Sequence, residues 1–140
     1  MKRLFLVLFV FGFISCSADK KQQDKEFIEQ MERSTLSDVK VISYEKADSL
    51  INGYLNYVKN YPEDSLCATY LYRAADVYAN TKRCIESIKT YDRLIAEYPD
   101  NVLVESAYFL KGIVFSQTCL NKEKAAEAFT KKKKKYPNSN

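Results

Sequence analysis

The stretch YPEDSLCATYLYRAADVYANTKRCIESIKTYDRLIAEYPD, residues 61–100, decides the fold of this chain. It opens with a tyrosine-proline pair and carries a second one near its end, and the only other proline of the chain also follows a tyrosine. Pro62, Pro99 and Pro137 are therefore spaced by 37 and 38 residues. A regular spacing of this size indicates an internal repeat in which each unit is one supersecondary element.

Each unit has room for two helices and a turn, and the acidic residues that follow Pro62 and Pro99 suit a helix N-terminus. Apolar residues recur at helical spacing in both halves of the complete unit: Leu71, Ala74, Ala75 and Tyr78, then Ile88, Tyr91, Leu94 and Ile95. A helix with one apolar stripe must bury it against a neighbour. The pattern predicts an all-α fold, a short α-α superhelix of stacked helical hairpins.

The positions at which the units agree resemble the tetratricopeptide repeat. They are two small positions and an aromatic one, held by Ala75 and Gly112, by Ser87 and Ala125, and by Tyr91 and Phe129. The resemblance implies a repeat domain over residues 44–140 that opens on a half-unit, a lone helix from Tyr44 to Tyr61. A generic bundle of helical hairpins is the alternative, and the shared register of several positions disfavours it.

The N-terminus has the pattern of an exported lipoprotein. Lys2 and Arg3 precede an apolar run over residues 4–14, which is typical of a cleaved secretory signal. The run is too short to span a bilayer, which takes roughly 20 residues. Its ending, FISC at residues 13–16, resembles the bacterial lipobox, with Phe13 where leucine is usual. The resemblance implies a signal peptide over residues 1–15 and acylation of Cys16; a signal without lipid, or a membrane span, is the alternative.

Residues 16–43 are mostly polar, apart from an apolar cluster at Phe27, Ile28 and Met31, and we expect a lipidated tether with at most a short helix. Repeats behind a lipobox resemble exported proteins of Gram-negative envelopes, namely the BamD-like lipoproteins of β-barrel assembly and the CpoB-like proteins associated with Tol-Pal. The residues after Cys16 lack the familiar inner-membrane retention signal. The resemblance therefore implies the outer membrane, on its periplasmic or surface face.

The composition argues against nucleic-acid binding and against enzyme activity. The net charge is +4, but Lys2, Arg3 and the run Lys131–Lys135 supply the excess, and the remainder is mildly acidic. The chain has no histidine, no Gly-rich phosphate loop, no serine in a nucleophile elbow and no cysteine pair with zinc spacing. We expect no enzyme activity, no metal and no cofactor, which leaves a binding surface.

The family resemblance places a peptide groove on the first helix of each hairpin. The residues that it implies are Thr69, Tyr72, Asp76 and Asn80, then Ser106, Phe109, Ile113 and Gln117. Rigid aromatic area beside a charge suits an extended or helical peptide of an envelope protein. Packing of Phe109 and Ile113 against the neighbouring helix is the alternative use of these side chains.

The expected function is that of a lipid-anchored scaffold or adaptor, attached to the membrane through acylated Cys16. It would mediate protein–protein interactions in the cell envelope, with outer-membrane protein assembly as its most specific form. The alternative is a structural or surface-exposed lipoprotein that binds glycan or nutrient-uptake partners.

The cysteines add a geometric expectation. Cys84 begins a second helix and Cys119 lies in the next turn, so stacking puts both at one edge and permits a disulfide if their Cα atoms approach within about 7 Å. Cys67 lies at the opposite end of its hairpin, which excludes a pair with Cys84.

The last helix departs from the repeat pattern, since Lys132 and Lys133 stand where Leu94 and Ile95 stand one unit earlier. Two explanations stay open. Either the final helix is exposed and its lysines contact solvent or anionic lipid, or the chain is truncated and lacks a capping helix.

Overall fold

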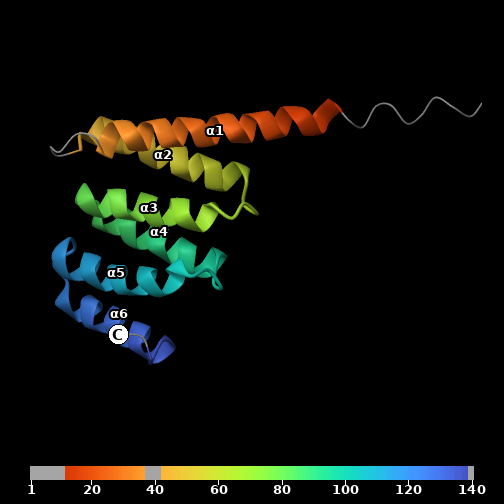
Figure 1. Cartoon of the computed structure of the whole chain (residues 1–140). Coiled ribbons are helices and arrows are strands. Elements are labelled where there is room, and N and C mark those ends of the chain that lie inside the picture. Colours follow the sequence, from red (N-terminus) through yellow and green to blue (C-terminus); the bar gives the residue numbers. More distant parts are fainter. Residues whose placement is uncertain (1–11, 37–41, 139–140) are drawn as a thin grey trace, which may run out of the picture.

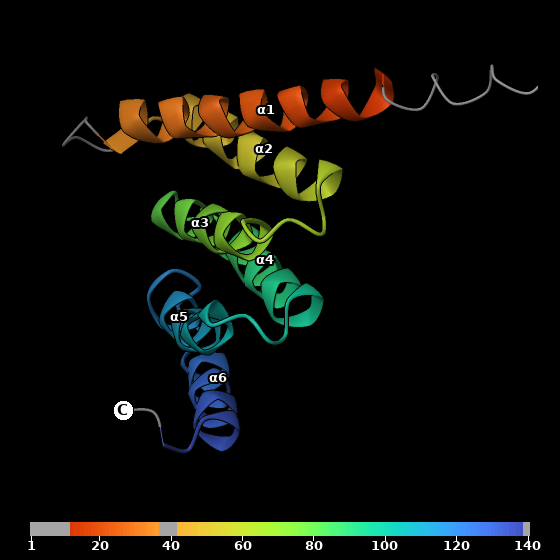
Figure 2. The same ribbon diagram turned by 45° about the vertical axis from the view of Figure 1, so that its right-hand side comes forward.

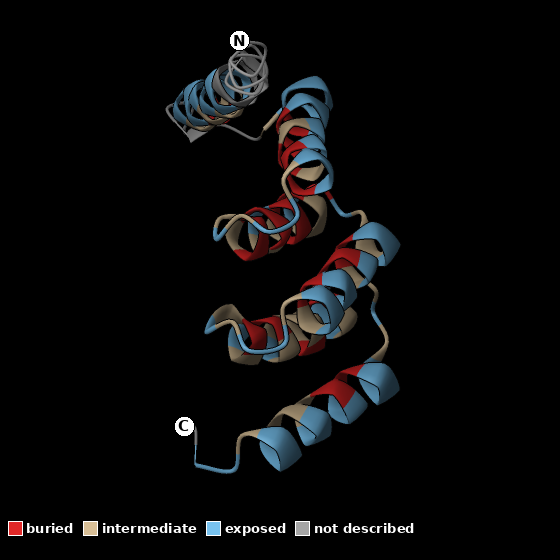
Figure 3. Ribbon diagram, turned by 90° about the vertical axis from the view of Figure 1, so that its right-hand side faces the viewer, coloured by how far each residue is buried: buried red, intermediate tan, exposed pale blue. Residues whose placement is uncertain are grey.

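The structure, a computed structural model, describes residues 12–36 and 42–138. These residues form six helices and no strand: α1 (Gly12–Leu36), α2 (Tyr44–Asn60), α3 (Cys67–Asn80), α4 (Cys84–Glu97), α5 (Leu103–Gln117) and α6 (Lys122–Lys135). Consecutive helices run antiparallel and stack as hairpins (Figures 1 and 2). Seen from one edge, α1, α3 and α5 form one layer and α2, α4 and α6 the other (Figure 3). The predicted all-α superhelix of hairpins is confirmed.

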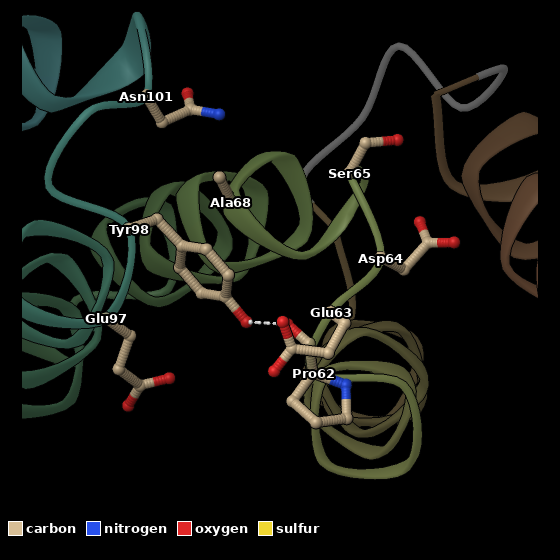
Figure 4. Close-up of a pocket in the computed structure, with 8 residues that line it drawn as sticks. All are labelled: Pro62, Glu63, Asp64, Ser65, Ala68, Glu97, Tyr98 and Asn101. Carbon is tan, nitrogen blue, oxygen red and sulfur yellow. Dashed lines mark hydrogen bonds between the residues drawn. The ribbon is translucent and has the colours of Figure 1, made fainter.

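The first two tyrosine-proline pairs lie in the turns that join one hairpin to the next, and the third follows the end of α6. The side chain of Asp64 accepts a hydrogen bond (2.8 Å) from the backbone N–H two residues on, and Asn101 does the same (3.0 Å) at the next turn. The Tyr98 hydroxyl donates to the carbonyl oxygen of Pro62 (2.9 Å), as the dashed line in Figure 4 shows. A side-chain hydrogen bond of the same kind therefore closes each turn just before the following helix, and the two turns are bonded to each other.

The small residues of the repeat stand where the two helices of a hairpin approach most closely. Ser87 is fully buried, and its hydroxyl donates to the carbonyl oxygen of Ala75 (2.9 Å). A Cβ atom added to Gly112 would lie only 2.6 Å from Cζ of Phe129. At both positions the facing helix is so close that only a small side chain fits.

The N-terminal segment differs from the tether expected over residues 16–43. It forms most of α1, which packs along α2 and buries Ile28 to 1% exposure. The hydroxyls of Tyr54 and Tyr61 on the α2 side donate to Glu32 (2.6 Å) and Asp24 (2.8 Å) of α1. The sequence suggested a lone helix from Tyr44 to Tyr61. In the structure this helix, α2, is the second helix of a hairpin whose first helix is α1.

Ion pairs also connect α1 to the second hairpin. Lys21 forms an ion pair with Asp64 in the turn before α3, and Glu32 forms one with Arg73 of α3. Burial alone would raise the pKa of the Asp64 carboxyl, but Lys21 and the bonded N–H of Leu66 outweigh it and hold that pKa below its usual value. These contacts hold α1 from Lys21 to Glu32 against the second hairpin.

The last described helix has little apolar surface. α6 buries Ala125 and Ala128 against α5, and Lys132 forms an ion pair with Glu105 of α5 (3.3 Å). The large apolar side chains that are exposed among the described residues all lie outside α6: Phe27, Tyr44, Ile85, Val102, Phe109 and Leu120. The solvent-facing side of α6 is therefore polar.

Candidate protein-binding surface

The eight residues expected to form the groove lie on α3 and α5, which are neighbours in one layer of the stack (Figure 3). Four are half-buried, and these are Thr69, Tyr72, Asp76 and Ile113. The other four are exposed, and these are Asn80, Ser106, Phe109 and Gln117. All eight therefore keep some accessible surface.

On α3, the predicted residues are tied to the second helix of their own hairpin. The Tyr91 hydroxyl donates to the carboxylate of Asp76, and the ring of Tyr72 meets the Tyr91 ring edge-on at 5.9 Å between centroids. Burial raises the pKa of the Asp76 carboxyl, and the hydrogen bond from Tyr91 opposes this only in part. Asp76 is therefore engaged in a hydrogen bond within its own hairpin, and its negative charge is less available to a ligand than the sequence suggests.

On α5, the equivalent contact is more open. The rings of Phe109 and Phe129 lie 5.7 Å apart, in the register of Tyr72 and Tyr91, yet Phe109 remains 47% exposed. Phe129 is also partly exposed, whereas Tyr91 is fully buried. Phe109 therefore packs against α6, as the alternative interpretation expects, and its role in a groove stays a prediction for the half of its surface that is accessible.

Two shallow pockets lie outside the predicted groove, and sequence reasoning did not identify either. One, of about 480 Å³, lies between the first two tyrosine-proline turns (Figure 4) and is lined by Pro62, Glu63, Asp64, Ser65, Ala68, Glu97, Tyr98 and Asn101. The other, of about 500 Å³, lies between α1 and α2. The regular spacing of the prolines could have predicted the first pocket, because repeats of equal length bring successive turns together. Within the described ranges, no group of three or more side chains could hold a metal ion.

The disulfide that the sequence permits is present in the structure. Cys84 and Cys119 are bonded, with Cα atoms 5.3 Å apart, at the edge opposite the tyrosine-proline turns. Cys67 is free and buried, its thiol donates to the carbonyl oxygen of Tyr61 (3.0 Å), and burial raises its pKa. Cys67 is therefore a structural residue, since a raised pKa keeps it in the unreactive thiol form.

The predicted signal peptide lies mostly outside the described residues. Cys16 falls within the first turns of α1, but its side chain is not among those described, so its acylation stays a prediction. Across residues 12–36 and 42–138, no helix combines the length and the apolar character that crossing a membrane requires.

Comparison with known proteins supports the repeat. Residues 69–101, from the first turn of α3 to the turn before α5, match the family model described as tetratricopeptide repeat. The search of curated proteins found no match, and neither did the search of solved structures. The match covers the central hairpin, and the shared geometry of the other two extends the same architecture along the chain. Tetratricopeptide repeats generally bind protein partners, and this suggests an interaction scaffold.

Proposed function

We propose that this chain is a lipid-anchored tetratricopeptide-repeat scaffold that holds protein partners at the cell envelope and performs no catalysis. The observation that carries the proposal is the accessible aromatic surface of α5 beside α3, centred on Phe109, within repeats of a kind that binds proteins. A rigid aromatic side chain offers a large contact area at little entropic cost, which favours such a position as an anchor for a partner.

Two features support a place in the envelope. A disulfide between Cys84 and Cys119 suits an oxidising compartment, because cytosolic thiols are kept reduced. The charged and apolar start of the chain, ending at Cys16, suits export and acylation. A role in outer-membrane protein assembly is the most specific form of the proposal, and it rests on the resemblance to BamD-like and CpoB-like proteins.

Site-specific crosslinking tests the proposed surface. A photo-crosslinking amino acid is placed at Ser106 or Gln117, which are exposed on α5, and at Lys89 or Ala96, which are exposed on α4, as the matched control. We expect envelope proteins to be captured from the α5 positions and not from α4, and Phe109→Ala to lower the yield.

The identity of the captured molecules then separates the versions of the proposal. Barrel-assembly or Tol-Pal proteins would support the role in outer-membrane assembly, whereas transporters or polysaccharide would favour the glycan or nutrient-uptake alternative. Equal capture from both layers would contradict a binding surface on α5. Metabolic labelling with a palmitate analogue tests the anchor separately, since the label should appear on the chain and disappear in Cys16→Ser.

A further inference from the structure

One edge of the stack gathers the beginning of α1, the tyrosine-proline turns and the end of α6. The alternating direction of the helices requires this arrangement, and the contacts agree with it. Lys21 of α1 meets Asp64 in the first turn, and the hydroxyl of Tyr98 in the second turn bonds to the first. Past the end of α6, the ring of Tyr136 lies 6.3 Å from that of Tyr108 on α5. Figure 3 looks onto this edge.

The end of α6 makes one part of this edge strongly basic. The helix contains seven lysines and two glutamates, and five of the lysines are the run Lys131–Lys135, which we call the basic end. Lys131 pairs with Glu127 (2.6 Å), and Lys135 lies over the rings of Tyr108 and Tyr136. Lys133 and Lys134 are exposed.

Helix stability alone does not account for the basic end. Cations in the last turn of a helix interact favourably with its dipole, but that effect is weak for exposed charges, and adjacent lysines on one helix repel one another. At position 132 the earlier repeat places Leu94, and Lys132 there is paired with Glu105 (3.3 Å). At position 133 it places Ile95, and the exposed Lys133 gives up apolar burial with no such contact to explain it within α5. A ligand for the charge would explain this exchange.

The proposed lipid anchor would bring a membrane to the same edge, and this step rests on the proposed function. Cys16 precedes Lys21 by five helical residues, which is about 8 Å along the axis of α1. That distance is close to the Debye length of about 8–10 Å at ordinary ionic strength. A bilayer that holds an acyl chain on Cys16 is thus within electrostatic reach of Lys21, where α1 meets this edge.

We propose that the basic end binds the anionic headgroups of the membrane in which Cys16 is anchored, so that the stack rests with its tyrosine-proline edge on the bilayer. Two acidic side chains on this edge are paired, Asp64 with Lys21 and Glu97 with Arg93 (2.9 Å). Glu63 and Asp100 are exposed in the turns and oppose the contact, so the attraction comes from the basic end alone. An acyl group and a polybasic patch are two signals that act together in membrane binding. Two separated points of attachment also fix an orientation, which one flexible anchor cannot do.

Tryptophan fluorescence tests the contact directly, because the chain contains no tryptophan. Asn138→Trp puts a single indole beside the basic end, and Leu120→Trp puts one at the opposite edge as the matched control. The full chain is bound to vesicles that carry a headgroup-linked quencher, made of phosphatidylcholine alone or with added phosphatidylglycerol. We expect quenching of the indole at position 138 only with phosphatidylglycerol and only at low salt, and no quenching at position 120.

Charge removal gives the quantitative result. Each lysine near an anionic surface strengthens binding about fivefold, so Lys133→Gln with Lys134→Gln should lower the ratio of docked to undocked protein about 25-fold. Lys89→Gln with Lys122→Gln removes the same charge from exposed positions elsewhere and should leave the ratio unchanged. Equal quenching in neutral and anionic vesicles, or an unchanged ratio in the Lys133 and Lys134 variant, would overturn the proposal.

Intact-mass analysis of the same samples separates this proposal from the anchor. Charge-dependent quenching in a chain without an acyl group would refute acylation and leave the lipid contact standing. Charge-independent quenching in an acylated chain would refute the lipid contact and leave the anchor standing.

Discussion

Replacing Ile28 with alanine tests whether α1 belongs to the folded domain. Ile28 is 1% exposed, and a Cβ atom added to Gly53 of α2 would lie 3.3 Å from its Cγ1 atom, so the two helices are in close contact. Truncation of a buried isoleucine to alanine costs about 2–5 kcal/mol. We expect about 3 kcal/mol for Ile28→Ala. Phe27 is 51% exposed, and Phe27→Ala should cost only about 1 kcal/mol as the neighbouring control.

Urea unfolding followed by circular dichroism measures both variants. With a slope of about 1.5 kcal/mol per molar urea, the expected loss lowers the midpoint for Ile28→Ala by about 2 M. Stacked repeats open in parts, so α1 can detach before the remainder unfolds. In that case, hydrogen exchange should show lost protection in α1 while α3 to α6 keep theirs. The packing of α1 would be refuted if Ile28→Ala and Phe27→Ala lowered the free energy of unfolding by amounts within about 0.5 kcal/mol of each other and the α1 amides of the unmutated chain exchanged without protection.

Three further predictions concern the other contacts. The disulfide between Cys84 and Cys119 spans 35 residues, so its reduction should lower the free energy of unfolding by about 3–4 kcal/mol, and a reductant should have no effect on urea unfolding of the double serine variant. Gly112→Ala should lower the melting temperature, because crowding against Phe129 costs about 1–3 kcal/mol and exceeds the helix-propensity gain of about 1 kcal/mol; a higher melting temperature would contradict the close contact. Since burial raises the pKa of Asp76, the native state binds that proton more tightly than the unfolded chain does. The carboxyl therefore lowers stability as pH rises from about 4 through its folded-state pKa, and Asp76→Asn should remove this part of the pH dependence of melting. An identical pH dependence of melting in the Asp76→Asn variant would contradict the raised pKa.

The hairpins were predictable from the sequence because their contacts are apolar and periodic. Leu71 and Leu94 follow the helical spacing and are fully buried. The small residues at positions 87 and 112 mark where helices approach, and Cys84 and Cys119 follow from the register of those helices. Periodicity, residue size and register are all visible in one sequence, and together they define the stack from α2 to α6.

The position of α1 was not predictable in the same way, because much of its contact with the stack is polar. Its described side chains on that face include Lys21, Asp24 and Glu32, which a hydropathy pattern assigns to solvent. Their partners are tyrosine hydroxyls and charged groups more than 20 residues away, and no local spacing encodes such pairs. For the predicted groove residues the same limit applies, because the hydroxyl that donates to Asp76 belongs to Tyr91 of α4, and no local pattern in α3 indicates that contact.

A packed α1 changes what a lipid on Cys16 would do. A flexible tether over residues 16–43 would have a root-mean-square length of about 30 Å and would let the stack rotate freely. The helix instead leaves about 8 Å between Cys16 and the first contact with the stack, at Lys21. The surface around Phe109 would then keep a fixed height and direction above the bilayer, especially if the basic end also binds it. A partner would have to meet that surface close to the membrane, which favours partners that are themselves embedded in it or attached to it.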